Sequence, residues 1–465
     1  MLTSSLRGRT SRYAVILALL LLFVPHLDER IARAATQAKS FRLDNGLRVV
    51  IVPDHRTGIV THSVWYRAGS ADDPLGQSGL AHFLEHLMFR DADTHGAEEF
   101  SKVVARLGGQ DEGVTNFDTT YYYQIIARPH LAQVMKLEAQ RMAQLRLEDE
   151  AVNAEREVVL EELYSDEIQY VFEDQMRAIL YYSHPYKTPT IGWKNEVEKL
   201  SLAQALAFHR RYYTPSNAIV VIVGNVTFDE VKALATETYG RLPASTDVVK
   251  SDRPQEPAPL ASRRIELRDS RVGQPRFQRL YLTPSIATAR PGEAEALTLL
   301  MNIVADGPNS RLYRTLVIDE KVASSALGGY FGKRRDYGEI SISVAPARGR
   351  SLADVEAAVD RVLLQIRESG ISAEELERAK RKSAAKFTYD TDNQQTVAER
   401  YGGQLIIGRT IADVEAWPNR LAKVSVEDVA AAADQYFDAR RSVTGFLRPP
   451  TEERVTKKDD NKAHE

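Results

Sequence analysis

The order of apolar and polar positions predicts strands and helices that do not alternate strictly. Residues 41–54, FRLDNGLRVVIVPD, place two apolar runs around an Asp-Asn-Gly turn and predict a β-hairpin. The apolar run at 218–223, which ends before a Gly-Asn pair, predicts a buried strand. Long helical patterns occupy 130–147 and 148–182. We therefore expect a protein of the α+β class.

A repeat and a linker predict two related halves. The helix start KLSL at 199–202 aligns without gaps on KVSV at 423–426, which lies 224 positions later, and a strand follows each helix. Residues 246–262 contain three prolines and little periodic hydrophobicity, which predicts a linker. Two such halves that face each other can enclose a chamber. The expected units are an N-terminal domain over 35–245, a homologous C-terminal domain over 263–449 and a charged tail over 450–465.

The first residues of the chain differ from the rest. Several arginines precede the apolar run AVILALLLLFV at 14–24, and Ala-Arg-Ala at 32–34 offers small residues where a signal peptidase requires them. This pattern predicts a cleaved signal peptide over 1–34 and an exported protein. A permanent anchor or an organelle-targeting peptide fits less well, because the apolar core is short for a bilayer and has no polar face. No later segment approaches a membrane span.

Length and composition add limits to this picture. A chain of 465 residues is too long for one ordinary core, which agrees with two domains. The 61 basic and 64 acidic residues nearly balance, and this gives no support to a nucleic acid bound by a basic face. The chain has no cysteine, so it forms no disulfide, and a metal ion must be held by His, Asp or Glu.

The segment AHFLEHLMF at 81–89 carries the candidate chemistry. His82 and His86 are four positions apart, so on a helix they share one face and can bind one metal ion. Glu85 can reach the same edge of the helix without competing for that ion. The competing interpretation is a core helix with polar residues on its solvent side. The spacing His-x-x-Glu-His favours the metal site, because it is the inverted form of the zinc-protease signature.

Such a site needs a third protein ligand, because catalytic zinc usually takes three and leaves one position for water. The segment AEREVVLEEL offers four glutamates on one predicted helix: Glu155, Glu157, Glu161 and Glu162. Glu155 and Glu162 are seven positions apart and share a face, so one can ligate while the other orients a histidine. Spacing alone does not choose among the four.

The chain resembles the pitrilysin-type zinc peptidases, a family that includes insulysin and mitochondrial processing peptidase. The resemblance runs from FRLDNGLRVVIV to GFLRP, and it is carried by AHFLEHLMF, AEREVVLEEL, HPYKTPTIGW and YYTPSNAIVVIVGNV. It implies that Glu162, which lies 76 positions after His86, is the third ligand. It also implies that Glu155 supports the ligands from behind, and that two homologous α/β-sandwich halves, each an antiparallel-type sheet flanked by helices, form a clam-shaped chamber.

The resemblance implies a zinc-dependent endopeptidase that hydrolyses peptides or unfolded polypeptide segments. His82, His86 and Glu162 are expected to hold one Zn²⁺ per chain, and Glu85 is expected to act as general base on the zinc-bound water. The family also has members that have lost the metal and serve as structural or peptide-binding subunits. Retention of all four residues in this chain argues against that second function.

Two departures from the family pattern concern substrate binding. Relatives often read Asn-Ala-x-Thr on a strand that binds the peptide through its backbone. The matching residues here are Glu112, Gly113, Val114 and Thr115, while Asp118 and Thr120 fit the pattern. A carboxylate therefore replaces an amide at position 112, and we expect this to alter which peptides fit.

The second departure lies in the C-terminal half. Relatives that act alone carry an Arg and a Tyr, seven apart, that grip the substrate carbonyl, and the aligned positions here are Ile318 and Ser325. We therefore expect a homologous partner subunit to supply that grip, as in bacterial exported two-subunit relatives of the periplasm, with a homodimer as the alternative. The nearby Arg311 and Tyr313 are expected to pack helices.

Aromatic residues elsewhere receive structural interpretations. His184, Pro185, Tyr186 and Trp193 of the HPYKTPTIGW segment are expected to pack the long helix against the sheet. Tyr121, Tyr122 and Tyr123 alternate along a predicted strand, so at least one faces the core and another can line the chamber.

Overall fold

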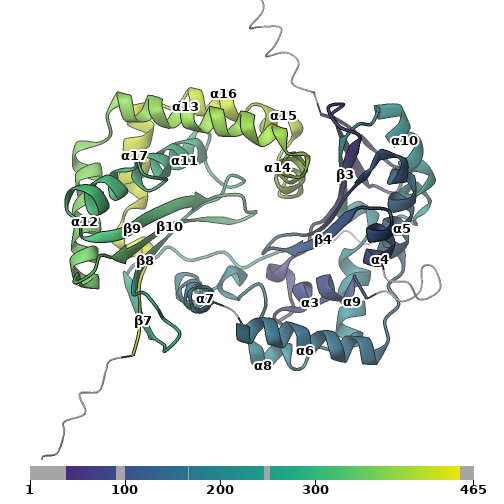
Figure 1. Cartoon of the computed structure of the whole chain (residues 1–465), viewed down its shortest axis with the longest axis horizontal. Coiled ribbons are helices and arrows are strands. Elements are labelled where there is room, and N and C mark those ends of the chain that lie inside the picture. The colour runs from purple at the N-terminus through teal and green to yellow at the C-terminus, as the bar shows by residue number, and fades with distance from the viewer. Residues whose placement is uncertain (1–37, 91–99, 166, 246–251, 451–465) are drawn as a thin grey trace, which may run out of the picture.

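The structure is a computed structural model, and it describes residues 38–90, 100–165, 167–245 and 252–450. In this part of the chain two β-sheets, flanked by helices, lie side by side (Figure 1). This confirms the predicted fold class of two similar halves. The expected signal peptide at 1–34 and nearly all of the expected tail at 450–465 lie outside the described residues.

The first sheet has six strands in the order β1-β2-β6-β3-β5-β4. They are β1 (Lys39–Arg42), β2 (Arg48–Pro53), β3 (Ile59–Tyr66), β4 (Gln110–Thr115), β5 (Thr120–Ala127) and β6 (Ala218–Gly224). The predicted hairpin is confirmed, since β1 and β2 pair antiparallel across a turn in which Gly46 has φ +90°. Strand β6 runs parallel to β2 and antiparallel to β3, and β4 forms the edge beyond β5.

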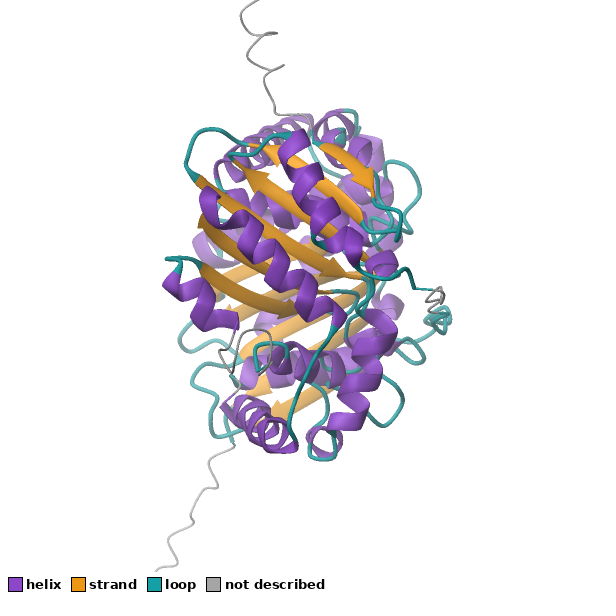
Figure 2. Ribbon diagram, turned by 90° about the vertical axis from the view of Figure 1, so that its right-hand side faces the viewer, coloured by secondary structure: helices purple, strands orange, loops and turns teal. Residues whose placement is uncertain are grey.

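Helices of the first half cover one face of this sheet (Figure 2). They are α3 (Leu80–Leu87), α4 (Phe100–Arg106), α5 (Leu131–Ala143), α6 (Asp149–Ser165), α8 (Lys194–Val197), α9 (Leu202–Tyr212) and α10 (Phe228–Glu237). The helix α7 (Ile168–Leu180) of the same half packs elsewhere. Along β6, Val220 and Ile222 pack into the core beneath these helices. Ile219, Val221 and Val223 point to the opposite face and are buried there as well. A strand that is covered on both sides reads as a continuous apolar run, which is why 218–223 lacks alternation.

The second sheet repeats the first. Its order is β7-β11-β8-β10-β9, with β7 (Arg263–Arg268), β8 (Arg276–Pro284), β9 (Ala323–Phe331), β10 (Tyr337–Pro346) and β11 (Ser442–Arg448). Strand β11 is parallel to β7 and antiparallel to β8, as β6 is to β2 and β3. Ser201 and Ser425 each cap a helix of 11 residues that precedes the central strand, so the predicted repeat is a repeat of structure.

The described part of the second half contains seven α-helices. They are α11 (Glu293–Val304), α12 (Leu352–Ser369), α13 (Ala373–Tyr389), α14 (Gln394–Ile406), α15 (Ile411–Glu415), α16 (Trp417–Ala422) and α17 (Val426–Tyr436), with a π-helical segment at Tyr313–Asp319. Helices α11, α12, α13 and α17 contribute to one buried core with the sheet. Among the described residues, no helix combines the length and the apolar character that a membrane crossing requires.

The two halves exchange one helix each. Helix α14 leaves its own half and packs on β3 and β6 of the first sheet, beside which it lies in Figure 1. Helix α7 makes the reciprocal contact with β7, β8 and β11 of the second sheet. A Cβ on Gly402 of α14 would lie 2.1 Å from Trp65, and one on Gly445 of β11 would lie 2.5 Å from Phe172 of α7. At each contact a glycine therefore lets the exchanged helix lie closer to the other half than any larger residue would allow. These two contacts hold the halves together as one unit.

The segment that joins the halves is tightly held. Arg253 is buried between the two domains and donates to Asp72 at 2.9 Å, to Asp336 at 2.9 Å and to Asp118. Glu256 accepts backbone N–H groups at the end of α7, from Ser183 and His184 at 3.0 Å. The composition of 246–262 predicts a linker, and the described part of it is fixed by a buried charge, which local sequence does not signal.

A cavity of about 550 Å³ lies between the halves. The turn between β4 and β5 forms one side of it, the tip of the β9–β10 hairpin forms another, and α14 closes it. Trp65 and Tyr121 stack in its wall, with ring centroids 3.8 Å apart. The halves therefore do enclose a space, and its lining is aromatic and polar.

Candidate metal site

Helix α3 is fixed at its N-terminus by a partly buried carboxylate. Asp73 accepts the N–H groups of Gly79 and Ala81, both at 2.8 Å, so donors that a helix start leaves without partners are satisfied. Gly79 has φ +84°, and a Cβ there would lie 2.4 Å from the carbonyl oxygen of Ile191. The backbone before α3 thus fits directly against the HPYKTPTIGW segment, where the N–H of Trp193 also donates to Ser78 Oγ at 2.9 Å.

The faces of α3 separate packing from polar function. Leu80, Phe83, Leu84 and Leu87 enter the core of the first half. His82 and His86 are largely covered, and Glu85 is only 8% exposed, so these side chains do not form a solvated face. The helix therefore packs in the core and also carries a polar cluster. The competing interpretation, in which these polar residues face solvent, is wrong.

His82, His86 and Glu162 come together across α3 and α6. Their nearest donor atoms all lie within 4.8 Å of one another. Glu162 Oε2 is 3.8 Å from His82 Nε2 and 3.6 Å from His86 Nε2. Zinc ligands bind about 2.0–2.2 Å from the ion, so the ligand atoms of a tetrahedral site lie roughly 3.4 Å apart. Two imidazoles and one carboxylate at this separation fit a zinc ion, with Glu162 on the open side.

Glu155 sits behind His86. Its Oε1 accepts from His86 Nδ1 at 2.9 Å, and its Oε2 accepts from Arg90 at 2.6 Å. Burial raises the pKa of Glu155, but the hydrogen bonds from His86 and Arg90 outweigh it and lower the pKa overall. A carboxylate that holds Nδ1–H leaves Nε2 with its lone pair toward Glu162, which is the tautomer a metal ligand needs.

The two histidines have different electrostatics. Burial, with a contribution from the neighbouring imidazole, lowers the pKa of His82 to about 3, so the ring is neutral at neutral pH. Burial also acts to lower the pKa of His86, but Glu155 and the nearby carboxylates outweigh it and raise the pKa. His82 Nδ1 is buried without a hydrogen-bond partner among the described residues. Glu157 and Glu161 of the same predicted set are exposed on α6 and do not join this cluster.

Glu85 faces the edge strand β4. Burial raises the pKa of its carboxyl group and the charge of Glu162 adds to this, while hydrogen bonds from Thr115 act in the opposite direction. A Cβ on Gly113 would lie 2.9 Å from Glu85 Oε1, so the carboxylate occupies the space that a side chain would take. The sequence pattern predicted Gly113 as part of the substrate-binding strand, without this contact to Glu85. An isolated glycine within a strand pattern is a signal of close approach, and it marks this position.

The predicted substrate strand has two different faces. Gly113 and Thr115 face α3, whereas Val114 packs toward the inner face of the sheet with Tyr121 and Tyr123. Glu112 accepts a hydrogen bond from the Tyr123 hydroxyl on that inner face. Among the residues that the structure describes, strand β4 pairs only with β5, which leaves an edge where a further strand can be added. Glu112 therefore lies beside such a strand but away from the histidines.

The residues predicted to be structural lie in packed junctions. The Tyr186 hydroxyl donates to Asp118 at 2.8 and 2.7 Å, and His184 Nε2 lies 3.2 Å from Asp336 of the second half. Arg311 forms two 2.7 Å bonds with Glu375 of α13, as a helix-packing residue does. Ile318 is 55% exposed in the π-helical segment, and Ser325 lies on the edge strand β9.

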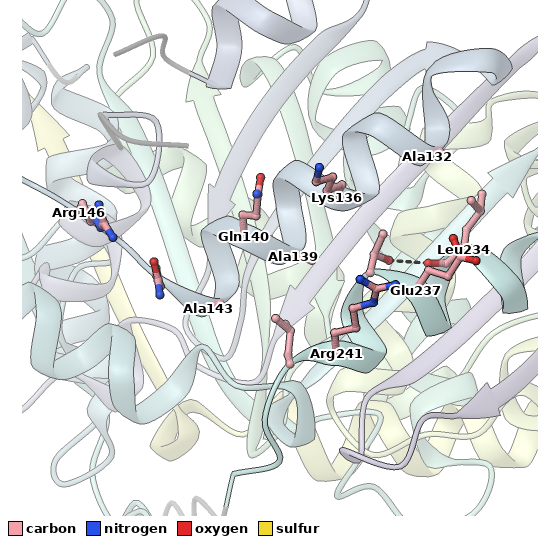
Figure 3. Close-up of a pocket in the computed structure, with 12 residues that line it drawn as sticks. Ala132, Lys136, Ala139, Gln140, Ala143, Arg146, Leu234, Glu237 and Arg241 are labelled. Atoms are coloured by element: carbon pink, nitrogen blue, oxygen red, sulfur yellow. Dashed lines mark hydrogen bonds between the residues drawn. The ribbon is translucent and has the colours of Figure 1, made fainter. Parts of the chain in front are cut away.

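Another hollow lies on the outside of the first half. A groove of about 660 Å³ lies between α5 and the segment from α10 to Leu242. Figure 3 shows Lys136 and Gln140 on one side of it and Glu237 and Arg241 on the other. Its lining, like that of the cavity between the halves, does not include the histidines, Glu85 or Glu162. The polar cluster instead opens at the surface, where the Glu162 side chain is 45% exposed.

Comparison with protein families identifies the class. Residues 48–194 match the family model described as insulinase, peptidase family M16, and residues 199–383 match the model described as the peptidase M16 inactive domain. The first model contains the whole His-x-x-Glu-His cluster with Glu162, and the second covers most of the rest of the chain. The chain belongs to the M16 family of pitrilysin-type peptidases.

Individual relatives agree in sequence and in fold. The zinc protease PqqE of Helicobacter pylori is 28% identical, over 88% of this chain and 93% of that protein. The crystal structure of a protease from the same organism superposes with a TM-score of 0.83 at 26% identity, and it covers 89% of this chain and 100% of that one. The periplasmic protease PqqL from Escherichia coli shares the fold with a TM-score of 0.74 at 21% identity, over 88% of this chain but only 47% of its own.

Proposed function

We propose that the chain is a zinc-dependent endopeptidase that hydrolyses peptides or unfolded polypeptide segments. His82, His86 and Glu162 would hold one Zn²⁺ per chain, and Glu155 would orient His86. The observation that carries this proposal is the distance of Glu162 Oε2 from the two Nε2 atoms, 3.8 and 3.6 Å, in a cluster whose second imidazole is already oriented by a carboxylate. When bound, the metal would supply Lewis acidity toward a water molecule and a peptide carbonyl.

Glu85 would act as the general base. Its carboxylate is held by Thr115 at the side of β4 and lies on the polar edge of α3 between the two histidines in sequence. A carboxylate whose pKa is raised by burial takes a proton from water more readily than an ordinary one. It can then return this proton to the leaving amine. A substrate that pairs with β4 as an added strand would place its backbone beside this group.

The zinc-bearing chain would act with a homologous partner subunit. Neither Ile318 nor Ser325 can donate the hydrogen bonds that an Arg and a Tyr would give to a substrate carbonyl. The candidate metal ligands do not line the cavity between the halves. A substrate held by the second half in that cavity would therefore not lie against the metal site. The fold match to PqqL spans 47% of that protein, which leaves room there for a second unit of this size. A second copy of this chain is the alternative partner.

The protein would work after export, in the periplasm. This rests on the signal-peptide pattern of residues 1–34, on the absence of cysteine from the sequence, and on the fold shared with a periplasmic protease. Zinc bound to the exported chain would then be supplied outside the cytoplasm.

Metal analysis and a peptide-library digest test the proposal. Purified chain should contain close to one zinc per molecule, and cleavage should depend on Glu85 and be abolished in Glu85→Gln while zinc is retained. The digest should run with the chain alone and with a co-purifying partner. If the chain alone cleaves as fast as the chain with its partner, the proposal that a partner subunit grips the substrate is wrong. Peptide binding without cleavage by the wild type would favour a structural or peptide-binding subunit, the function suggested by the description of the second family model as an inactive domain.

A further inference from the structure

A second cavity lies inside the C-terminal half, away from the metal ligands. It measures about 310 Å³ and is enclosed by α11, α13, α14, α16 and the end of β9. This volume is at the lower end of the range for small-ligand sites, so it takes about one residue of a ligand rather than a folded segment. Ile286, Phe387, Trp417 and Leu421 give it an apolar floor.

The charged groups of this cavity leave a positive excess. Asp390 lies 3.0 Å from Lys386 and 3.6 Å from Arg400, so one carboxylate serves two cations. Asp306 is paired with Lys382 at 2.8 Å. Lys333 also lines the cavity and forms no ion pair among the described residues. Its ammonium group is therefore available to an anion that enters from the mouth of the cavity.

Gln404, in the wall of this cavity, offers an uncharged hydrogen-bond acceptor. Gln404 of α14 is only 5% exposed, and its Oε1 has no hydrogen-bond partner within the described ranges. Buried amide oxygens are normally paired, and leaving one without a partner costs about 1–3 kcal/mol. The same wall carries Arg400, whose guanidinium is held over the Phe387 ring at 3.9 Å and donates to the Phe387 carbonyl oxygen at 2.9 Å.

We propose that this cavity binds the C-terminal residue of a peptide. Such a residue carries an α-carboxylate, an amide N–H and a side chain on one carbon atom. The carboxylate would meet Lys333, the N–H would donate to Gln404 Oε1, and an apolar side chain would lie on Phe387 and Trp417. The proposal rests on the proposed peptidase function, since it assigns to the second half a role in holding peptides.

The position of the cavity fits a peptide that extends from the first half. Tyr330, Gly332 and Lys333 line both this cavity and the larger one between the halves. The larger cavity reaches residues 116–119, which directly follow the end of β4. A chain that leaves the β4 edge at Thr115 therefore meets a continuous series of lining residues that ends at Lys333.

Calorimetric titration of the full chain tests this assignment, in the Glu85→Gln variant so that peptides stay intact. The probes are N-acetyl-phenylalanine, its carboxamide, and a short peptide that ends in phenylalanine as the free acid or as the amide. Both acids should bind, and each amide should bind on the order of tenfold more weakly, which corresponds to about 1.4 kcal/mol. Equal binding of acid and amide, or no binding of either acid, would overturn the proposal. Binding of the acetylated amino acid without the peptide would assign the cavity to free small carboxylates and would also overturn it.

Variants separate the cavity from general charge effects. Lys333→Gln should weaken binding of the acids on the order of tenfold, and Lys380→Gln, which removes the same charge from α13 outside the cavity lining, should not. Gln404→Leu should also weaken binding while the chain stays folded, because the lost oxygen has no partner. Equal effects of the two lysine variants would contradict the assignment. A chain that binds the acids but never cleaves peptides would keep this inference and reject the peptidase, and the reverse result would do the opposite.

Discussion

Gly113 and Glu85 occupy one space between the edge strand β4 and helix α3. A Cβ at position 113 would stand 2.9 Å from both Cγ and Oε1 of Glu85, and 3.0 Å from the ring of Phe89. A contact under 3.0 Å forces a neighbour to move, and Glu85 lies on α3 while Phe89 follows the end of that helix. The glycine thus sets how closely the carboxylate approaches the strand that a substrate would extend.

Gly113→Ala should therefore displace Glu85 and lower activity. A shift of about 1 Å in a reacting group costs on the order of 100-fold in rate, so kcat should fall by about that factor. Zinc content should remain near one per chain, because the histidines are not touched by the new methyl group. The matched control is Gly58→Ala, where an added Cβ meets nothing within 4 Å, and it should change kcat by less than threefold. Equal kcat values for the wild type and Gly113→Ala would contradict the assigned geometry.

Glu155→Ala should weaken metal binding. The substitution removes the acceptor that holds His86 Nδ1–H at 2.9 Å, so the ring loses its orientation and its tautomer. Loss of such a partner typically lowers metal affinity by about 10–100-fold. Competition with a chromogenic chelator measures this without any cleavage assay. Glu157→Ala, an exposed glutamate on the same helix, is the control, and the two variants should not give the same zinc affinity.

The pair Arg311–Glu375 should make stability depend on acid pH. The hydrogen bond from Arg311 lowers the pKa of Glu375 from 4.5 to about 2. Because the pKa is lower in the folded state, this stabilisation is complete above about pH 4.5 and is lost as the pH falls toward 2. After a discount for partial exposure the loss is about 1–2 kcal/mol.

Thermal unfolding at pH values from 2 to 6 measures this effect. The wild type should lose more stability over that range than Glu375→Gln does, since the variant has no proton to bind at this position. Glu374→Gln removes an exposed charge at the preceding position and should keep the dependence of the wild type. Parallel curves for the wild type and Glu375→Gln would show that the pair does not contribute.

Local patterns predicted the elements better than their partners. The hairpin at 41–54 and the strand at 218–223 follow from turn residues and an apolar run, and the structure contains both. The pattern of β6 could not reveal that α14, which begins 170 positions after β6 ends, covers its inner face, because helix exchange is a long-range event. The same limit applies to the linker. Its local sequence does not predict that Arg253 is buried among carboxylates from distant parts of the chain.

The candidate site was predictable to a similar degree. The spacing of His82 and His86 places both imidazoles on one helical face, and the structure keeps them there. Spacing alone left four glutamates of one helix as candidate ligands. In the fold, only Glu155 and Glu162 of these four reach the histidines. That choice depends on how α6 crosses α3, which is set by packing and not by sequence interval. The close approach of Gly113 depends on the same packing.

Two adjacent glycines of α14 should respond in opposite directions. A Cβ on Gly402 would lie 2.1 Å from Trp65 Cε2, whereas one on Gly403 would be 3.8 Å from the nearest atom of that ring. Trp65 cannot yield, because it stacks on Tyr121 at 3.8 Å and its Nε1–H donates to Ser63 at 3.0 Å. Gly402→Ala must therefore push α14 away from the first sheet, and we expect it to cost about 1–3 kcal/mol of unfolding free energy.

Gly403→Ala should instead stabilise the chain by up to about 1 kcal/mol, because alanine is the better helix former and its methyl group finds ordinary contact. Denaturant unfolding of both variants measures the difference. The comparison tests the helix exchange itself, since both substitutions add one methyl group to the same helix and differ in how closely that group approaches Trp65 of the other half. If α14 did not pack on Trp65, both alanine variants would raise the free energy of unfolding by a similar amount. That result would contradict the conclusion that the exchanged helix α14 joins the two halves.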